Sequence, residues 1–276
     1  MSPWTEVRLV TWRELGKSFR SVKGLVLAGL TLTGGGVAAM LLAWINRETR
    51  TALSPELGAR ATQELVLSRM YGATTAASLA DAPPGLLGML SATLWLSPML
   101  VALIAFDAIS GELQHRTVRF WATRVRRTSY VLSKFLAAWL VVLTITLGLN
   151  VIVWVATSQI GAVAPAAVVR WGLRFFAVSV PITAAWCGGG TLVGSQFRTP
   201  RVALVAVFAT FFGMWTLYVA GGYSGQAWLA YAYPNAYDQF FLSPLPSEWA
   251  TGVAGTMAMA AGSIASAALL FARRDL

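Results

Sequence analysis

Long apolar segments alternate with more polar stretches along the whole chain. Each apolar segment is long enough to cross a hydrocarbon core of about 30 Å as a helix. The pattern therefore predicts an all-α polytopic membrane protein that forms one transmembrane domain over residues 1–276. The six expected spans are 24–44, 86–106, 135–156, 173–193, 202–220 and 249–271.

The residues before the first span, 1–23, predict an amphipathic helix. Ser2 can cap this helix, and Pro3 suits its first position. A helix with one apolar and one charged face lies in the membrane interface. The expected apolar face carries Trp4, Val7, Leu15, Phe19 and Val22, and the opposite face carries Glu6, Arg13, Lys17 and Arg20.

A basic segment, 107–134, separates the second and third expected spans. It holds six of the 21 Lys and Arg residues of the chain and only two acids, Asp107 and Glu112. Because cytoplasmic loops carry an excess of Lys and Arg, this charge places the segment in the cytoplasm. The segment is too long and too patterned for a simple turn. We interpret it as the region that a cytoplasmic partner binds.

Part of the basic segment, 111–123, predicts a cytoplasmic helix. Ser110 can cap its N-terminus, and Glu112 lies in the first turn, where the helix dipole favours an acid. One side can pack against the spans or lipid headgroups, and the other offers charge to a soluble partner. The first side carries Leu113, Thr117, Phe120 and Trp121, and the second carries His115, Arg119 and Arg126. On charge alone, an equal alternative is that the arginines only satisfy the positive-inside rule and bind anionic lipid.

The distribution of charge along the chain predicts its topology. Six spans place both termini on one side, and 15 of the 21 Lys and Arg residues fall in 1–23, 107–134, 195–201 and 272–276. This bias predicts cytoplasmic termini in a plasma membrane, the inner membrane of a bacterium. The net charge of +10 does not indicate a nucleic-acid partner, because the basic residues follow the sides of the membrane and form no single patch.

Two longer segments are expected on the outer side. The first, 45–85, contains a helix signal over 55–71. That helix either packs on the mouth of the bundle or binds an external accessory protein. The second, 221–248, is rich in Tyr, Trp and Pro, which suit the membrane interface, so it is expected to insert partly.

The chain lacks the residue sets that enzymes and metal sites need. It has one histidine, His115, and one cysteine, Cys187, and no acid lies in the middle of an expected span. We therefore expect no catalysis, no metal and no cofactor in this chain. A proton-driven carrier places ionisable residues inside its spans, so transport here would need energy from another subunit.

Two triple-glycine runs, 34–36 and 188–190, lie inside expected spans. Glycine lets helices approach closely, so tight helix packing is the favoured interpretation. Three glycines in a row also weaken a helix, so a hinge is the alternative.

The basic segment resembles the coupling region of ABC-2-type ABC transporter permeases. Glu112 matches the acid of the family pattern, Thr117 its threonine, Arg127 its arginine and Lys134 its lysine. Two positions depart from the pattern, since Arg116 and Arg124 stand where the family prefers glycine and proline. The span number, the amphipathic N-terminus and the terminal segment 271–276 extend the resemblance over the chain.

The resemblance implies a permease subunit, most often of an exporter, whose energy comes from two ATP-binding cassette ATPase subunits. These partners would bind ATP and Mg, and a second permease copy would complete a homodimer, or a heterodimer with a similar chain. The residues expected to couple to the ATPases are Glu112, His115, Arg116, Thr117, Arg119, Phe120, Trp121, Arg124, Arg126, Arg127 and Lys134. The alternative function is a membrane anchor or mechanotransmitter that passes ATPase motion to an external protein without transport.

Overall fold

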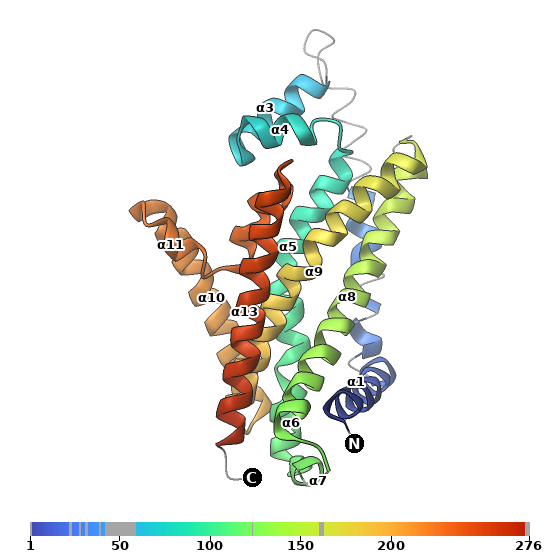
Figure 1. Cartoon of the computed structure of the whole chain (residues 1–276). Helices are drawn as coiled ribbons and strands as arrows, with labels where there is room; N and C mark the ends of the chain where they lie inside the picture. The colour runs from blue at the N-terminus through green and yellow to red at the C-terminus, as the bar shows by residue number, and fades with distance from the viewer. Residues whose placement is uncertain are drawn as a thin grey trace.

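The computed structural model describes residues 2–21, 24–27, 29–30, 33–38, 40–41, 59–122, 124–159 and 163–273. In these parts of the chain, every regular element is a helix. Figure 1 shows a bundle of long helices, with the N-terminal helix α1 and the C-terminal end of the last helix, α13, at one end of the bundle. The short helices α3 and α4 lie at the other end.

Five helices in the described ranges are long and apolar enough to cross a membrane. Each of four of them begins with a proline in its first turn, where the missing N–H is not needed. The five are α5 (Pro84–Ala105, continued by α6, Asp107–Gln114), α8 (Arg127–Gln159), α9 (Pro165–Gln196), α10 (Pro200–Ser224) and α13 (Pro246–Ala272).

The first expected span, 24–44, falls in a stretch that is described only in part. Residues 24–27 and 33–38 within it are helical. A Cβ atom added at Gly35 would lie 2.8 Å from Cδ2 of Leu149 on α8, so this stretch passes close to α8. The number of six spans remains a prediction.

Helix α9 lies at the centre of the bundle and packs against α5, α8, α10 and α13. Its glycines allow the closest approaches. A Cβ atom at Gly188 would lie 3.0 Å from the Cα atom of Ala260 on α13, and one at Gly190 would lie 3.1 Å from Cβ of Ala105 on α5. The second triple-glycine run therefore serves tight helix packing in this arrangement.

The segment between α10 and α13 packs into the bundle. It forms α11 (Ala227–Ala230), the 3-10 helix η1 (Pro234–Tyr237) and α12 (Asp238–Leu242). The Nδ2 atom of Asn235 donates to the carbonyl oxygen of Leu94 on α5 (2.7 Å), and Nε1 of the buried Trp186 on α9 donates to Oδ1 of Asn235 (2.9 Å). One amide thus joins three elements. We call α11, η1 and α12, with their contacts, the aromatic end.

The helices α3 (Ala59–Tyr71) and α4 (Ala73–Leu79) form a small cap near the start of α5. The side-chain amide of Gln63 fixes this cap by donating to the carbonyl oxygens of Leu79 (3.2 Å) and Ala82 (2.9 Å). The helix expected over 55–71 therefore exists from Ala59, and the expected start at 54–58 lies outside the described residues.

Helix α1 (Pro3–Arg20) is capped by Ser2, whose Oγ accepts from the backbone N–H of Thr5 (3.3 Å). The faces expected from the sequence agree with the structure only in part, because Val7 of the apolar face is buried but so is Glu6 of the charged face. Glu6 and Val7 are both buried against α8, whereas Trp4 is 70% exposed. The reason is that the start of α8 is polar, so it contacts an acid and apolar residues of α1 together.

Candidate functional site at the basic end of the bundle

The expected helix over 111–123 is wrong in its bounds, because a break divides the basic segment. Helix α6 ends at Gln114, and a separate short helix, α7 (Val118–Ala122), follows. The break lies at Arg116, whose φ of 57° is in the left-handed region. Ser110 is no cap but lies inside α6, where its Oγ donates to the carbonyl oxygen of Phe106 (2.6 Å).

The break gives a physical meaning to one departure from the family pattern. Glycine adopts the left-handed conformation without the steric cost that a side chain adds. The family prefers glycine at the position of Arg116, which is the position that needs this conformation here. This chain makes its left-handed turn with a charged, exposed side chain.

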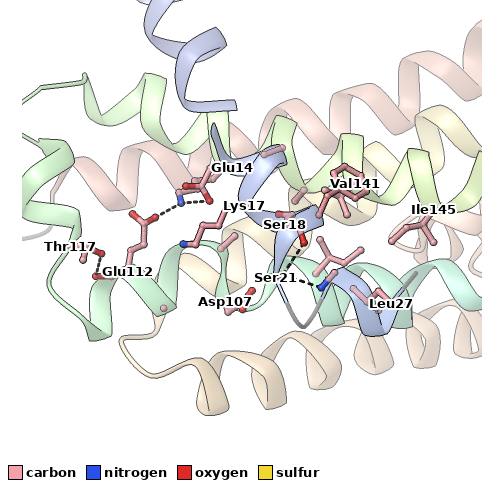
Figure 2. A pocket seen from close by; sticks show the side chains of 18 of the residues that line it. Glu14, Lys17, Ser18, Ser21, Leu27, Asp107, Glu112, Thr117, Val141 and Ile145 are labelled. Atoms are coloured by element: carbon pink, nitrogen blue, oxygen red, sulfur yellow. Dashed lines mark hydrogen bonds and ion pairs between the residues drawn. The ribbon is translucent and has the colours of Figure 1, made fainter. Parts of the chain in front are cut away.

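A buried ion cluster lies directly beside this turn (Figure 2). The Nζ atom of Lys134 lies 2.6 Å from Oε1 of Glu112 and 2.9 Å from Oε2 of Glu14. The hydroxyl of Tyr130 donates to Oε2 of Glu112 (2.8 Å). We call Glu14, Glu112, Tyr130 and Lys134 the Lys134 cluster. It joins α1, α6 and α8.

The Lys134 cluster is largely shielded from solvent. Lys134 is 2% exposed and Glu112 is 8% exposed. The two residues were expected to couple to the ATPase, and this stays a prediction. Within this chain they have a structural role, because the cluster fixes α6 to α1 and α8.

Further contacts attach α1 to the beginning of α8. The backbone N–H of Arg126 donates to Oε2 of Glu6 (3.2 Å), and Oγ of Ser133 donates to the carbonyl oxygen of Val7 (3.3 Å). The guanidinium of Arg13 lies 4.6 Å from the ring centroid of Trp121 on α7, which is a favourable cation–π distance. Helix α1 is therefore held by both α7 and α8.

A second small hydrophobic core connects this region to the end of α13. The ring of Tyr130 stacks on that of Phe271 with 5.6 Å between centroids, and Nη1 of Arg127 donates to the carbonyl oxygen of Ala272 (2.6 Å). The buried members of this core are Ile109, Val118, Tyr130, Val131, Ala267 and Phe271. The basic segment is thus a packed part of the bundle, and we call it, with α1 and the end of α13, the basic end.

The solvent-facing part of the basic end is cationic and aromatic. Phe120 is 51% exposed, and the guanidinium of Arg124 lies 4.1 Å from its ring centroid. Phe120 was expected to face the spans, but the break at Arg116 changes the helix phase so that Val118 is buried instead. The exposed residues, which we call the basic tip, are His115, Arg116, Thr117, Phe120, Arg124 and Arg126.

The remaining expected residues have other positions. Trp121 and Arg127 are half-buried, and the side chain of Arg119 lies outside the described part of the structure. Sequence reasoning missed Glu14 and Tyr130. Glu14 carried a weak signal, because it is an acid within an otherwise basic N-terminal segment, whereas Tyr130 carried none. Within the described ranges, no three His, Cys or acidic side chains gather closely enough to hold a metal ion.

The fold and the basic end together define a multi-pass helical membrane protein with a charged, packed region at one end of its spans. The chain belongs to the ABC-2 family transporter proteins, because the model of that family matches residues 8–276. It is therefore a membrane component of an ABC transporter, a class that associates with ATP-binding cassette subunits. A comparison with curated proteins found no match.

Proposed function

We propose that this chain is the permease subunit of an ABC exporter, and that separate ATPase subunits bind its basic tip. The observation that carries the proposal is the way in which the basic tip is attached to the helices of the bundle. Phe120 stands on the short helix α7, and the exposed arginines lie just before and just after that helix. The Lys134 cluster and the second core connect this segment to α1, α8 and α13. A partner that moves the tip would therefore move three parts of the bundle together.

The connection between α6 and α5 supports a transmission mechanism. Helix α6 follows α5 after a single residue, Phe106, so it prolongs a transmembrane helix toward the tip. ATP binding brings the two ATPase subunits together, and hydrolysis lets them separate. Each movement displaces α6 and α7, and the spans follow because packed helices shift as units.

The complete transporter would contain two permease chains and two ATPase subunits, with ATP and Mg bound only by the ATPases. We infer a homodimer, because the chain carries one set of spans. The basic tip would lie in the cytoplasm together with α1 and the C-terminal end of α13, which Figure 1 places at the same end of the bundle. Export as the direction of transport rests on the family resemblance.

The test is purification of the full-length tagged chain from its host, with the ATPase subunit identified by mass spectrometry and ATP hydrolysis measured. Arg124→Glu with Arg126→Glu reverses two exposed charges of the tip. Exposed ion pairs contribute only about 0.2–1 kcal/mol each, but like charges across an interface cost more. We therefore expect this double variant to lose most of the bound ATPase at moderate salt.

The matched control is Arg198→Glu with Arg201→Glu, an equal charge change at exposed positions around the start of α10. Membrane levels of all variants are matched before purification. Retention of the ATPase by the control and its loss from the tip variant support the proposal. If both variants retain the ATPase equally, the basic tip does not bind it, and the proposal is wrong.

A further inference from the structure

A cavity of about 430 Å³ lies beside the Lys134 cluster, between α1, α5, α6, α8 and residues 24–27 (Figure 2). This volume falls within the range of about 300–1,000 Å³ that is usual for small-molecule sites. The role proposed above for the tip does not use this space. Its shape and lining therefore call for a separate explanation.

The lining changes from charged to apolar along the cavity. Figure 2 shows Glu112, Lys17 and Thr117 toward one end and Val141, Ile145 and Leu27 toward the other. Along α8 the lining residues recur every three or four positions and form one face of the helix. With a rise of 1.5 Å per residue, the face from Lys134 to Ile145 is about 16 Å long. An occupant would thus need a polar head and an extended apolar part.

The charged part of the cavity offers both signs of charge. Glu14 and Glu112 share a single ammonium group, that of Lys134, so this cluster keeps one excess negative charge. The side chain of Lys17 extends into the same space (Figure 2), and no residue in the described ranges forms an ion pair with it. Asp107 also lines this part of the cavity, which therefore carries three carboxylates and two ammonium groups. A headgroup with only one sign of charge would leave the groups of like charge unmatched.

We propose that this cavity binds one membrane amphiphile with a zwitterionic headgroup. Its phosphate binds Lys17, its ammonium group binds the carboxylate of Glu14, and its alkyl chain lies along Val141 and Ile145. Charge-assisted hydrogen bonds of this kind are stronger than neutral ones, and a partly enclosed site screens them less than water does. The site lies within one chain, so binding requires neither the ATPase nor transport.

The test uses the full-length chain in detergent with an equal mixture of three lipids that have the same acyl chains. These are phosphatidylethanolamine, which is zwitterionic, phosphatidylglycerol, which is anionic, and a trimethylammonium lipid without phosphate. Native mass spectrometry counts the lipids retained by each chain. We expect retention of one phosphatidylethanolamine, favoured about tenfold over either other lipid because each lacks one charged contact. Equal retention of either other lipid overturns the zwitterionic assignment.

Two variants locate the binding. Lys17→Glu should lower retention of phosphatidylethanolamine about tenfold, because the phosphate then meets a carboxylate. Arg8→Glu is the matched control, since Arg8 is an exposed residue of the same helix that does not line the cavity. Val141→Phe, which fills the apolar part, should lower retention of all three lipids. Equal retention by Lys17→Glu and Arg8→Glu overturns the proposal, even where Val141→Phe fails to fold.

Discussion

The basic end and the aromatic end of the molecule are held together by different kinds of interaction. At the basic end, three helices meet at one ammonium group, with two carboxylates within 2.9 Å of it. At the aromatic end, three elements meet at one neutral amide, that of Asn235, within 2.9 Å of its partners on Trp186 and Leu94. Each end thus uses one side chain as a joint, but only one of the joints is charged.

The difference matters because the two joints fail differently. Removing one partner from a buried ion pair leaves an uncompensated charge, which costs more than the intact pair contributed. Removing a neutral amide leaves an unpaired N–H or carbonyl, which costs less. The basic end should therefore be the more sensitive to substitution, and the aromatic end the less sensitive to ionic strength.

The largest expected effect is that of Lys134→Met. The variant leaves Glu14 and Glu112 close together without their shared cation, so the free energy of unfolding should fall by about 3 kcal/mol. Titration with SDS, followed by tryptophan fluorescence, measures this loss. Arg8→Met is the control, because Arg8 is exposed, does not line the cavity and should lose less than about 0.5 kcal/mol. Similar losses in both variants would contradict the description of the Lys134 cluster as a buried joint.

Asn235→Ala tests the joint at the aromatic end. The variant leaves Nε1 of Trp186 without its partner and removes one of two side-chain donors to the carbonyl of Leu94, since Oγ of Ser97 still donates to it (2.9 Å), so we expect a loss of about 2 kcal/mol. The loss should be the same at low and high salt, since no ion is involved. The exposed Gln239→Ala is the control. A loss of stability that depends strongly on salt would contradict the conclusion that neutral interactions hold the aromatic end together.

Gly188 and its neighbour Gly189 lie inside α9 and belong to neither of the two joints. They allow the effect of one added methyl group to be compared at two adjacent positions. A methyl group at Gly188 would meet the backbone of Ala260, whereas one at Gly189 would meet only Cε1 of Phe211 at 3.7 Å. Gly188→Ala should therefore lower the free energy of unfolding by about 1–2 kcal/mol through overpacking. Gly189→Ala should instead raise it by up to about 1 kcal/mol, because alanine favours the helix. The opposite order would contradict the close packing of α9 on α13.

Asp238 gives the smallest expected effect and introduces pH into the comparison. Burial raises the pKa of this carboxyl from 3.8 to about 6. The protonated form is thus favoured in the folded protein, so its contribution to stability is full below about pH 4 and is lost as the pH rises through 6. Asp238→Asn keeps the neutral form at every pH. Its free energy of unfolding should match that of the parent at pH 4 and exceed it at pH 8, by about 1 kcal/mol after allowance for partial exposure.

The control for Asp238 is Gln239→Glu, which adds a carboxylate at the next position, where the side chain is exposed. This variant should show no corresponding change between pH 4 and pH 8. If the free energies of unfolding of Asp238→Asn and the parent change with pH in parallel, the titration of Asp238 does not affect stability, and the prediction is wrong.

Hydropathy predicted the apolar cores of the five described spans, because the membrane imposes a length and a composition on each of them. It did not predict where the helices end. Helix α8 begins at Arg127, although the expected span begins at 135, since a helix can continue into water after its apolar part ends. Hydropathy therefore locates the membrane along the sequence and leaves the helix limits open.

The candidate site was predictable in composition but not in geometry. The excess of positive charge in 107–134 is visible in the sequence, and so are its aromatic residues. The break at Arg116 depends on a backbone conformation that arginine rarely adopts, so no local pattern indicated it. The pairing of Glu14 with Lys134 joins residues that are far apart in the chain, and only the packing of α1 on α8 brings them together.

The sharing of Lys134 between two carboxylates has a consequence for movement. If α1 withdraws with Glu14, Lys134 keeps a neutral pair with Glu112, and if α6 withdraws with Glu112, it keeps a neutral pair with Glu14. Neither departure leaves the lysine alone, but a departure of both helices does. Electrostatics would therefore let α8 release either α1 or α6 at little cost, but would oppose the release of both at once.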